Sequence, residues 1–189
     1  MMHTRQPIFK LLIFSLIFSW GIFNVQAQEP VPSAQQILDE AYAVAKKENK
    51  KVFIIFHASW CGWCHRMDTS MNDPSCKKFF DDNFVVRHLT VDEAKDKMYL
   101  ENPGANAFRT KYHGDNQGIP FWLIFDQDGK LLADSKIRKP GEGPAEGSNA
   151  GCPASEEEVN FFVNILSRTT PLQKSDLAII AKRFRKNEH

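Results

Sequence analysis

The run KVFIIFH, residues 51–57, most constrains what this chain can fold into. It is almost continuously apolar and rich in β-branched and aromatic side chains. Such a run is typical of a strand that is buried on both faces and lies in the middle of a covered sheet. The dithiol segment Cys61-Gly62-Trp63-Cys64 follows directly. The sequence therefore predicts a pair of cysteines at the end of a central strand.

Helical and strand-like patterns alternate along the rest of the chain. Helices are expected at residues 33–49, after Cys61, at 105–112, from 155 onward and at 172–184, with one or two helical turns at 75–83. Further strands are expected at 84–91, at 121–125 and from 130 to 133. The polar turn 126–129 joins the last two strands as a hairpin. This alternation predicts an α/β fold, a central mixed sheet flanked by helices with an extra C-terminal helix.

Residues 1–27 have the pattern of a secretory signal. Arg5 and Lys10 precede the apolar run 11–23, and small residues follow at the spacing of a cleavage site. The run is shorter than the roughly 20 residues of a membrane-spanning helix, and a retained anchor is the alternative. The mature protein is expected to be periplasmic or otherwise secreted.

The organisation that follows from these patterns has four parts. They are a signal peptide at 1–27, a lead-in with the first helix at 28–50, the main domain at 51–168, and a C-terminal helix and tail at 169–189. The Gly/Pro-rich stretch 138–153 is expected to be a surface loop.

The net charge of +1 argues against a strongly charged partner. Nucleic-acid binding needs a basic stripe, and the basic run 182–186 is interpreted as a solvated helix end. Nucleic acid is therefore not an expected partner.

The segment SWCGWCHRM, residues 59–67, has two interpretations. Cys61 and Cys64 form a C-x-x-C dithiol, but with His65 they also match the attachment signature of c-type haem. The haem interpretation needs His65 as proximal ligand and one of Met67, Met71 and Met98 as distal ligand. Small c-type cytochromes are mostly helical, whereas this motif follows a buried strand, so the dithiol is favoured. A zinc site usually takes two close cysteine pairs, which the chain lacks.

Trp60, Cys61 and Cys64 after a buried strand, with Gly118-Ile119-Pro120 before a hairpin, resemble the thioredoxin superfamily. The resemblance covers residues 51–135 in motifs, and the W-C-G-W-C centre is most similar to exported bacterial thioredoxin-like proteins. It implies a thioredoxin-like fold and a thiol–disulfide oxidoreductase that reduces or isomerises protein disulfides. The expected partners are protein substrates and an unidentified redox partner, with no cofactor and no metal.

Cys61 is the expected nucleophile of the redox-active disulfide Cys61–Cys64. The N-terminus of a helix carries a partial positive charge, which favours the thiolate and lowers the pKa of a cysteine there. Cys64, one turn further on, then resolves the mixed disulfide.

The expected substrate contacts are Trp60, Trp63, Ile119 and Pro120. The resemblance implies that Ile119 and Pro120 form a cis peptide facing the dithiol, in a loop that pairs with the substrate chain. Trp63 can contact substrate or pack across its own helix. Exposed Trp60 and Trp63 also suit the alternative of a module that holds client proteins without turnover.

The sequence departs from the family's pattern near the dithiol. Ile55 stands where thioredoxin and protein disulfide isomerase carry a buried acid, the usual proton acceptor for the second cysteine. His57 lies on the same face of the strand and is a candidate base, with a hydrogen-bonded core histidine as the alternative. Trp63 replaces the proline or histidine of those proteins, so the direction of electron flow stays open.

Cys76 and Cys152 lie outside these motifs. A structural disulfide between them, pinning the loop 138–153, is the first expectation. Free thiols and a second redox relay are the alternatives.

Overall fold

The computed structural model describes Met1, His3 and residues 30–188. Apart from Met1 and His3, the predicted signal peptide lies outside the described residues. In the part that is described, no helix is both long enough and apolar enough to cross a membrane.

A four-stranded mixed sheet with the strand order β2-β1-β3-β4 forms the centre of the fold. The strands are β1 (Lys51–His57), β2 (Phe84–Thr90), β3 (Phe121–Phe125) and β4 (Leu131–Asp134). β1 pairs in parallel with β2 and antiparallel with β3. Every side chain of β3 and the five central ones of β1 are buried, which confirms that the apolar run at residues 51–57 is a central strand.

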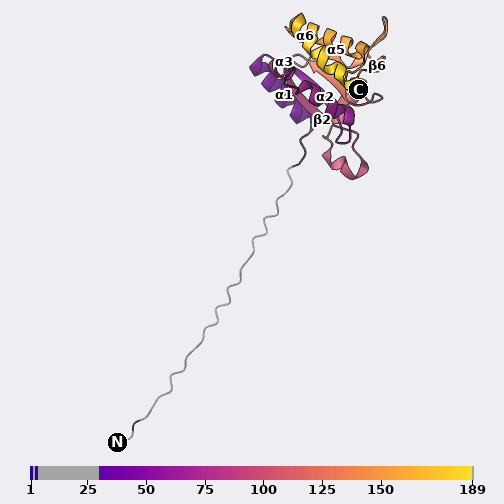
Figure 1. The fold of residues 1–189 in the computed structure, drawn as a ribbon. Coiled ribbons are helices and arrows are strands. Elements are labelled where there is room, and N and C mark those ends of the chain that lie inside the picture. Colours follow the sequence, from indigo (N-terminus) through magenta and orange to yellow (C-terminus); the bar gives the residue numbers. More distant parts are fainter. Residues whose placement is uncertain (2, 4–29, 189) are drawn as a thin grey trace.

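Helices cover both faces of the sheet (Figure 1). They are α1 (Ala34–Glu48), α2 (Gly62–Met71), α3 (Lys77–Asn83), α4 (Ala105–Lys111), α5 (Glu156–Thr169) and α6 (Lys174–Phe184), with 3-10 turns η1 (Lys95–Leu100) and η2 (Arg185–Glu188). α1 and α4 pack on one face of the sheet. α2, α3, α5 and α6 pack on the other. The predicted mixed sheet flanked by helices, with an extra C-terminal helix, is confirmed.

The two long helices begin where the sequence predicts, because each has a capping box. Ser33 caps α1 together with Gln36, and Ser155 caps α5 together with Glu158. In both, the serine oxygen accepts a backbone N–H while the partner side chain accepts the N–H of the serine. These bonds fix the residues at which α1 and α5 begin.

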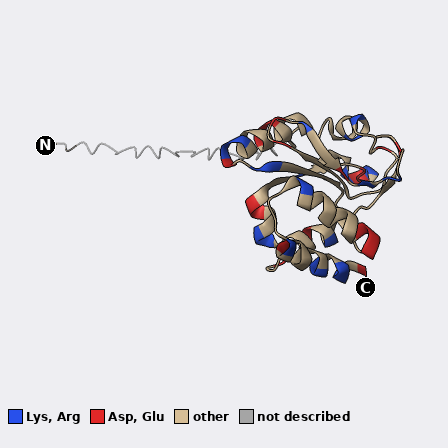
Figure 2. Cartoon of the chain, turned by 90° about the horizontal axis from the view of Figure 1, so that it is seen from above, with Lys and Arg blue, Asp and Glu red and all other residues tan. Residues whose placement is uncertain are grey.

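Basic and acidic side chains are interspersed over the molecule (Figure 2). Several of them form exposed pairs one helical turn apart, such as Lys77–Asp81 and Lys78–Asp82. Exposed pairs of this kind contribute little to stability. The surface therefore shows mixed charge, in agreement with the net charge of +1.

The predicted disulfide between Cys76 and Cys152 is wrong, because both are free and buried thiols. Cys76 precedes α3, and its sulfur lies 3.6 Å from the hydroxyl of Ser75. The sulfur of Cys152 accepts a hydrogen bond from the side-chain amide of Asn187 at 3.4 Å. Each sulfur therefore has a different polar neighbour, and the two are not bonded to each other.

Candidate functional site

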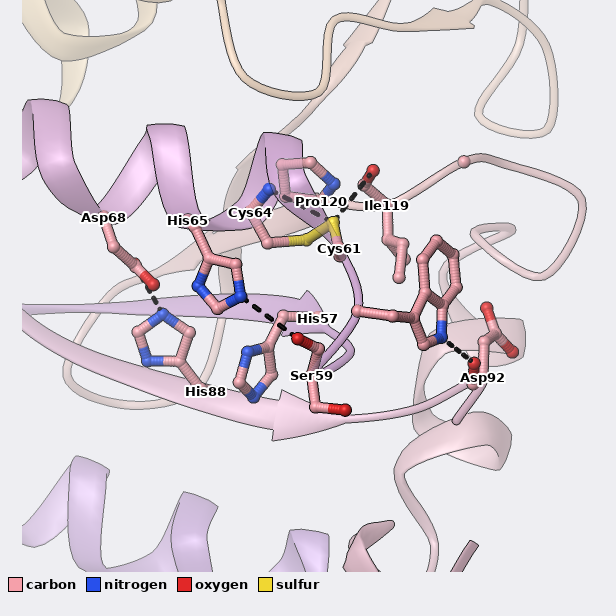
Figure 3. Close-up of a disulfide and its surroundings, with 12 residues drawn as sticks. His57, Ser59, Cys61, Cys64, His65, Asp68, His88, Asp92, Ile119 and Pro120 are labelled. Carbon is pink, nitrogen blue, oxygen red and sulfur yellow. Dashed lines mark hydrogen bonds and ion pairs between the residues drawn. A yellow bond between two sulfur atoms is a disulfide. The ribbon is translucent and has the colours of Figure 1, made fainter. Parts of the chain in front are cut away.

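The dithiol lies at the N-terminus of α2 as a disulfide between Cys61 and Cys64 (Figure 3). The S–S distance is 2.04 Å and the Cα–Cα distance is 5.3 Å. β1 ends at His57, and a turn closed by the Cys61 N–H on the carbonyl of Ala58 leads into the helix. Cys61 is the N-cap of α2, and its sulfur accepts the backbone N–H of Cys64 at 3.1 Å.

The loop before β3 lies against this disulfide, as Figure 3 shows. The peptide bond between Ile119 and Pro120 is cis, which confirms what the resemblance implied. The carbonyl oxygen of Ile119 is 3.6 Å from the sulfur of Cys61. A disulfide sulfur has no proton to donate, so this is a van der Waals contact in the oxidised protein. It becomes a weak hydrogen bond when Cys61 is a thiol.

Two tryptophans, one directly before Cys61 and one between the two cysteines, remain substantially exposed. Trp60 is 59% exposed, and its indole N–H donates to the carbonyl of Asp92 at 2.8 Å. Trp63 is 47% exposed, and the guanidinium of Arg66 lies 4.7 Å from the centre of its ring. Trp63 therefore packs along its own helix and still presents about half of its surface.

β1 carries Ile55 where the related proteins have a buried acid. His57, two residues later on the same face of the strand, is the ionisable side chain there. Ile55 is fully buried, paired in register with His88 and Trp122. A ring nitrogen of His57 lies 3.1 Å from the hydroxyl of Thr90. Of the two alternatives, the structure therefore shows the hydrogen-bonded histidine.

The sequence did not reveal that His57 belongs to a small cluster on the α2 side of the sheet. Its ring centre lies 4.8 Å from that of His88, which pairs with Asp68 of α2 at 2.8 Å. Burial, reinforced by the neighbouring His88, lowers the pKa of His57. His57 is therefore favoured as a neutral imidazole.

The turn before Cys61 is held by an acidic residue that sequence analysis also missed. Glu93 is 9% exposed, and its carboxylate accepts the Ser59 backbone N–H at 2.6 Å and the Ser59 hydroxyl at 2.8 Å. Its neighbour Asp92 forms a two-pronged ion pair with the buried Arg109. The contact between Glu93 and Ser59 could have been expected only from the topology. β1 and β2 run in parallel, so the segments that follow them lie at the same end of the sheet.

The side chains that the haem interpretation requires do not converge. His65 is exposed and its ring bonds the carbonyl of Ser59 at 3.1 Å. Met67 and Met71 are buried in the core beneath α2, whereas Met98 lies exposed on η1. The two sulfurs that would hold the haem are bonded to each other.

Comparisons with known proteins agree with this arrangement. A family model described as thioredoxin-like matches residues 33–127. A stretch of 64 residues, 32% of this chain, is 36% identical to part of an uncharacterized protein of Caenorhabditis elegans, and covers 9% of that protein.

Solved structures are similar at low sequence identity. A disulphide isomerase from Xylella fastidiosa Temecula1 is 20% identical, with a TM-score of 0.46 over 88% of this chain and 99% of that one. A DsbH oxidoreductase is 20% identical, with a TM-score of 0.43 over 76% of this chain and 93% of that one.

Proposed function

Because this chain belongs to the thioredoxin-like family and has its fold, we propose that it reduces or isomerises disulfides of extracytoplasmic proteins. The observation that carries the proposal is the Cys61–Cys64 disulfide at the start of α2, in contact with the cis Ile119–Pro120 loop. A dithiol at a helix N-terminus beside an exposed loop can exchange disulfides with another chain.

Cys61 is the attacking residue in this proposal. Once the disulfide is reduced, the N–H of Cys64 and the positive end of α2 both favour a thiolate at Cys61. That thiolate attacks one sulfur of the substrate disulfide, so a bond to Cys61 forms and the other substrate sulfur leaves as a thiolate.

Cys64 completes the transfer. Its thiolate attacks the sulfur of Cys61, re-forms the Cys61–Cys64 bond and releases the second substrate thiolate. The substrate disulfide has then gained two electrons and, with two protons, becomes two thiols. An external dithiol restores the reduced enzyme. Isomerisation results instead when, before Cys64 attacks, a different thiolate of the substrate attacks the substrate sulfur of the mixed disulfide, so that a new substrate disulfide forms and the Cys61 thiolate leaves.

The location outside the cytoplasm rests on the pattern of residues 1–27. A basic start, a short apolar run and a small-residue cleavage site direct a chain to export. Disulfide-bonded substrates persist in such compartments.

The deciding experiment measures turnover of a disulfide-bonded protein by the mature domain with a dithiol as electron donor. Cys61→Ser should abolish turnover, and Cys64→Ser should accumulate a mixed disulfide at Cys61. Cys76→Ala is the matched control and should keep full turnover, since Cys76 is buried in a different apolar cluster from Cys61 and Cys64. Full activity of Cys61→Ser contradicts the proposal, and client binding without turnover in the wild type favours the holding module.

A further inference from the structure

The connection between β4 and α5 lies beyond the residues that match the family model, yet it reaches the active-site loop. It contains a short antiparallel pair, β5 (Lys136–Ile137) and β6 (Ser148–Asn149). β6 ends at Asn149, which lies beside the loop that carries the cis peptide.

The carboxamide of Asn149 spans that loop. Its nitrogen donates to the carbonyl of Gly118 at 2.6 Å and to the carbonyl of Pro120 at 3.0 Å. Its oxygen accepts the backbone N–H of Gly151 at 3.1 Å. Both donors and the acceptor are therefore engaged, and these partners fix which end of the amide is nitrogen.

These bonds leave the backbone of Ile119, between the two carbonyls, available to another chain. The Ile119 carbonyl faces the sulfur of Cys61, and the Ile119 N–H has no backbone hydrogen-bond partner among the described residues. An extended peptide that pairs with this loop is therefore best served by the backbone of Ile119, because the carbonyls on either side already accept a hydrogen bond from Asn149.

Hydrogen bonds between the residues next to Asn149 and the sheet hold Asn149 in place. The N–H of Ala150 donates to the carbonyl of Ser135, whose hydroxyl accepts the backbone N–H of Trp122 in β3. The indole N–H of Trp122 donates to the carbonyl of Gly151 at 2.9 Å. Gly151 has φ of +56°, a conformation that favours glycine and brings this segment close to Pro120. A site held in this way needs little ordering when a ligand binds.

A cavity of about 270 Å³ lies between this segment, the cis loop and α2. Its apolar lining consists of Trp63, Ile119, Pro120, Ala150, Cys152 and Ala154. Of its polar side chains, Asn149 is engaged as described, and Glu158 accepts the backbone N–H groups of Ala154 and Ser155. Because most of the lining side chains are apolar and the amide of Asn149 is fully engaged, an uncharged apolar side chain fits the cavity best.

We propose that Asn149 is a positioning residue that presents Ile119 to an extended peptide substrate, with the cavity beside it receiving an apolar side chain of that peptide. This inference rests on the proposed function, since it names the substrate class of the same dithiol. Asn149 acts only through the loop and touches neither sulfur.

The test compares two substrates that differ in their need for the loop. One is a disulfide-bonded peptide with leucine beside its cysteine, and the other is a small aromatic disulfide without a peptide backbone. Asn149→Ala should lower kcat/KM for the peptide on the order of tenfold, mainly through KM, since two hydrogen bonds that fix the loop are lost. Turnover of the small disulfide should stay within about twofold of the wild type.

Two further variants separate positioning from general destabilisation. Asn149→Asp keeps the shape and the acceptor for the Gly151 N–H but has neither donor, so it should show the same selective loss. Asn116→Ala is the matched control. Asn116 is exposed in the loop that carries the cis peptide, and its side chain bonds its neighbour Asp115. This variant should behave as the wild type. A third substrate, the same peptide with aspartate in place of leucine, tests the cavity: the wild type should have the higher kcat/KM for the leucine peptide, and this preference should weaken only in the Asn149 variants.

Equal losses for both substrates, or no loss for the peptide, would overturn the inference. Failure of the proposed function has a different signature: the wild type turns over neither substrate. In that case, the Cys64→Ser background is used to measure the rate at which the Cys61 thiolate attacks an activated peptide disulfide, in which the peptide cysteine is bonded to an aromatic thiol that leaves as its thiolate. An unchanged rate on adding Asn149→Ala then refutes the role of Asn149 by itself.

Discussion

His57 shows how one side chain near the dithiol is governed by what surrounds it. It ends β1 on the face of Ile55, bonds Thr90 and lies with its ring tilted against that of His88. Burial and the His88 ring lower its pKa, so the folded protein prefers the neutral form. The groups around it include acids as well, Asp68 and Glu93, which act in the opposite direction but do not outweigh burial.

The stability of the protein should therefore depend on pH through His57. In the unfolded chain His57 has its ordinary pKa of about 6.5, whereas in the folded chain its pKa is lower. Below about pH 6.5 the unfolded state binds more protons, so the free energy of unfolding should fall as the pH falls from 7.5 toward 5. Urea denaturation across this range should show a shallower decrease for His57→Gln. Parallel curves for the two proteins would contradict this assignment.

The free cysteines Cys76 and Cys152 should be unreactive toward alkylating reagents in the folded protein. Burial raises the pKa of Cys152 to about 12 and also raises the pKa of Cys76. At pH 8 the thiolate fraction of Cys152 is then on the order of a thousandfold below that of an ordinary cysteine. After mild reduction, iodoacetamide should modify Cys61 rapidly and leave Cys76 and Cys152 until the chain is unfolded. Mass spectrometry of the alkylated peptides checks this, and rapid native labelling of Cys152 would refute it.

At the scale of elements, the sequence predicted the parts whose signals are local. The apolar runs gave β1 and β3, and serine caps located the starts of α1 and α5. The 3-10 turn η1 and the two-residue strands β5 and β6 were missed, because they are too short to show a period and depend on distant partners.

The residues of the candidate site fall into the same two groups, those in local sequence motifs and those that only the fold brings together. Cys61, Cys64 and Pro120 stand in motifs that can be read along the chain. Glu93 and Asn149 reach their partners across about 30 positions of sequence, so only the folded chain brings them to the dithiol and its loop. The expected Cys76–Cys152 disulfide failed for a related reason, since an even number of cysteines says nothing about their distance in space.

The capping box of α5 should contribute measurably to stability. Ser155→Ala removes the acceptor for the Glu158 N–H and should lower the free energy of unfolding by about 1 kcal/mol. Ser167→Ala, in the same helix, is the control, because Ser167 is exposed and bonds only a carbonyl within the last turns. It should change stability by less than about 0.5 kcal/mol. Urea denaturation measures both, and equal effects would show that the cap is not the cause.

At the scale of the molecule, a core packs on each face of the sheet in the described part of the chain, and the C-terminal helices complete the one beneath α2. Phe184 of α6 is fully buried and packs against Phe162 of α5, with ring centres 5.0 Å apart. Phe80 of α3 lies 6.3 Å from the same ring. The extra C-terminal helix therefore belongs to the core and is not an appendage.

Removing the aromatic ring of Phe184 should destabilise the entire protein. Phe184→Ala should lower the free energy of unfolding by about 3–5 kcal/mol, the usual cost of deleting a buried phenylalanine. Ile179→Ala, on the exposed face of the same helix, should cost less than about 0.5 kcal/mol. Denaturation followed by tryptophan fluorescence and by circular dichroism should give coincident transitions. A loss confined to α6, with the rest unchanged, would contradict a shared core.

The hydrogen bonds of Asn187 have a consequence for the order in which a nascent chain matures. Asn187 bonds Ser70 of α2, Cys152 and the carbonyl of Pro153, and so joins the back of the dithiol helix to the wall of the cavity. A ribosome releases Cys61 and Cys64 more than a hundred residues before it releases this anchor. During synthesis the two thiols therefore meet their surroundings before the fold around them is complete, and any oxidant that reaches them then acts before α2 has its final support.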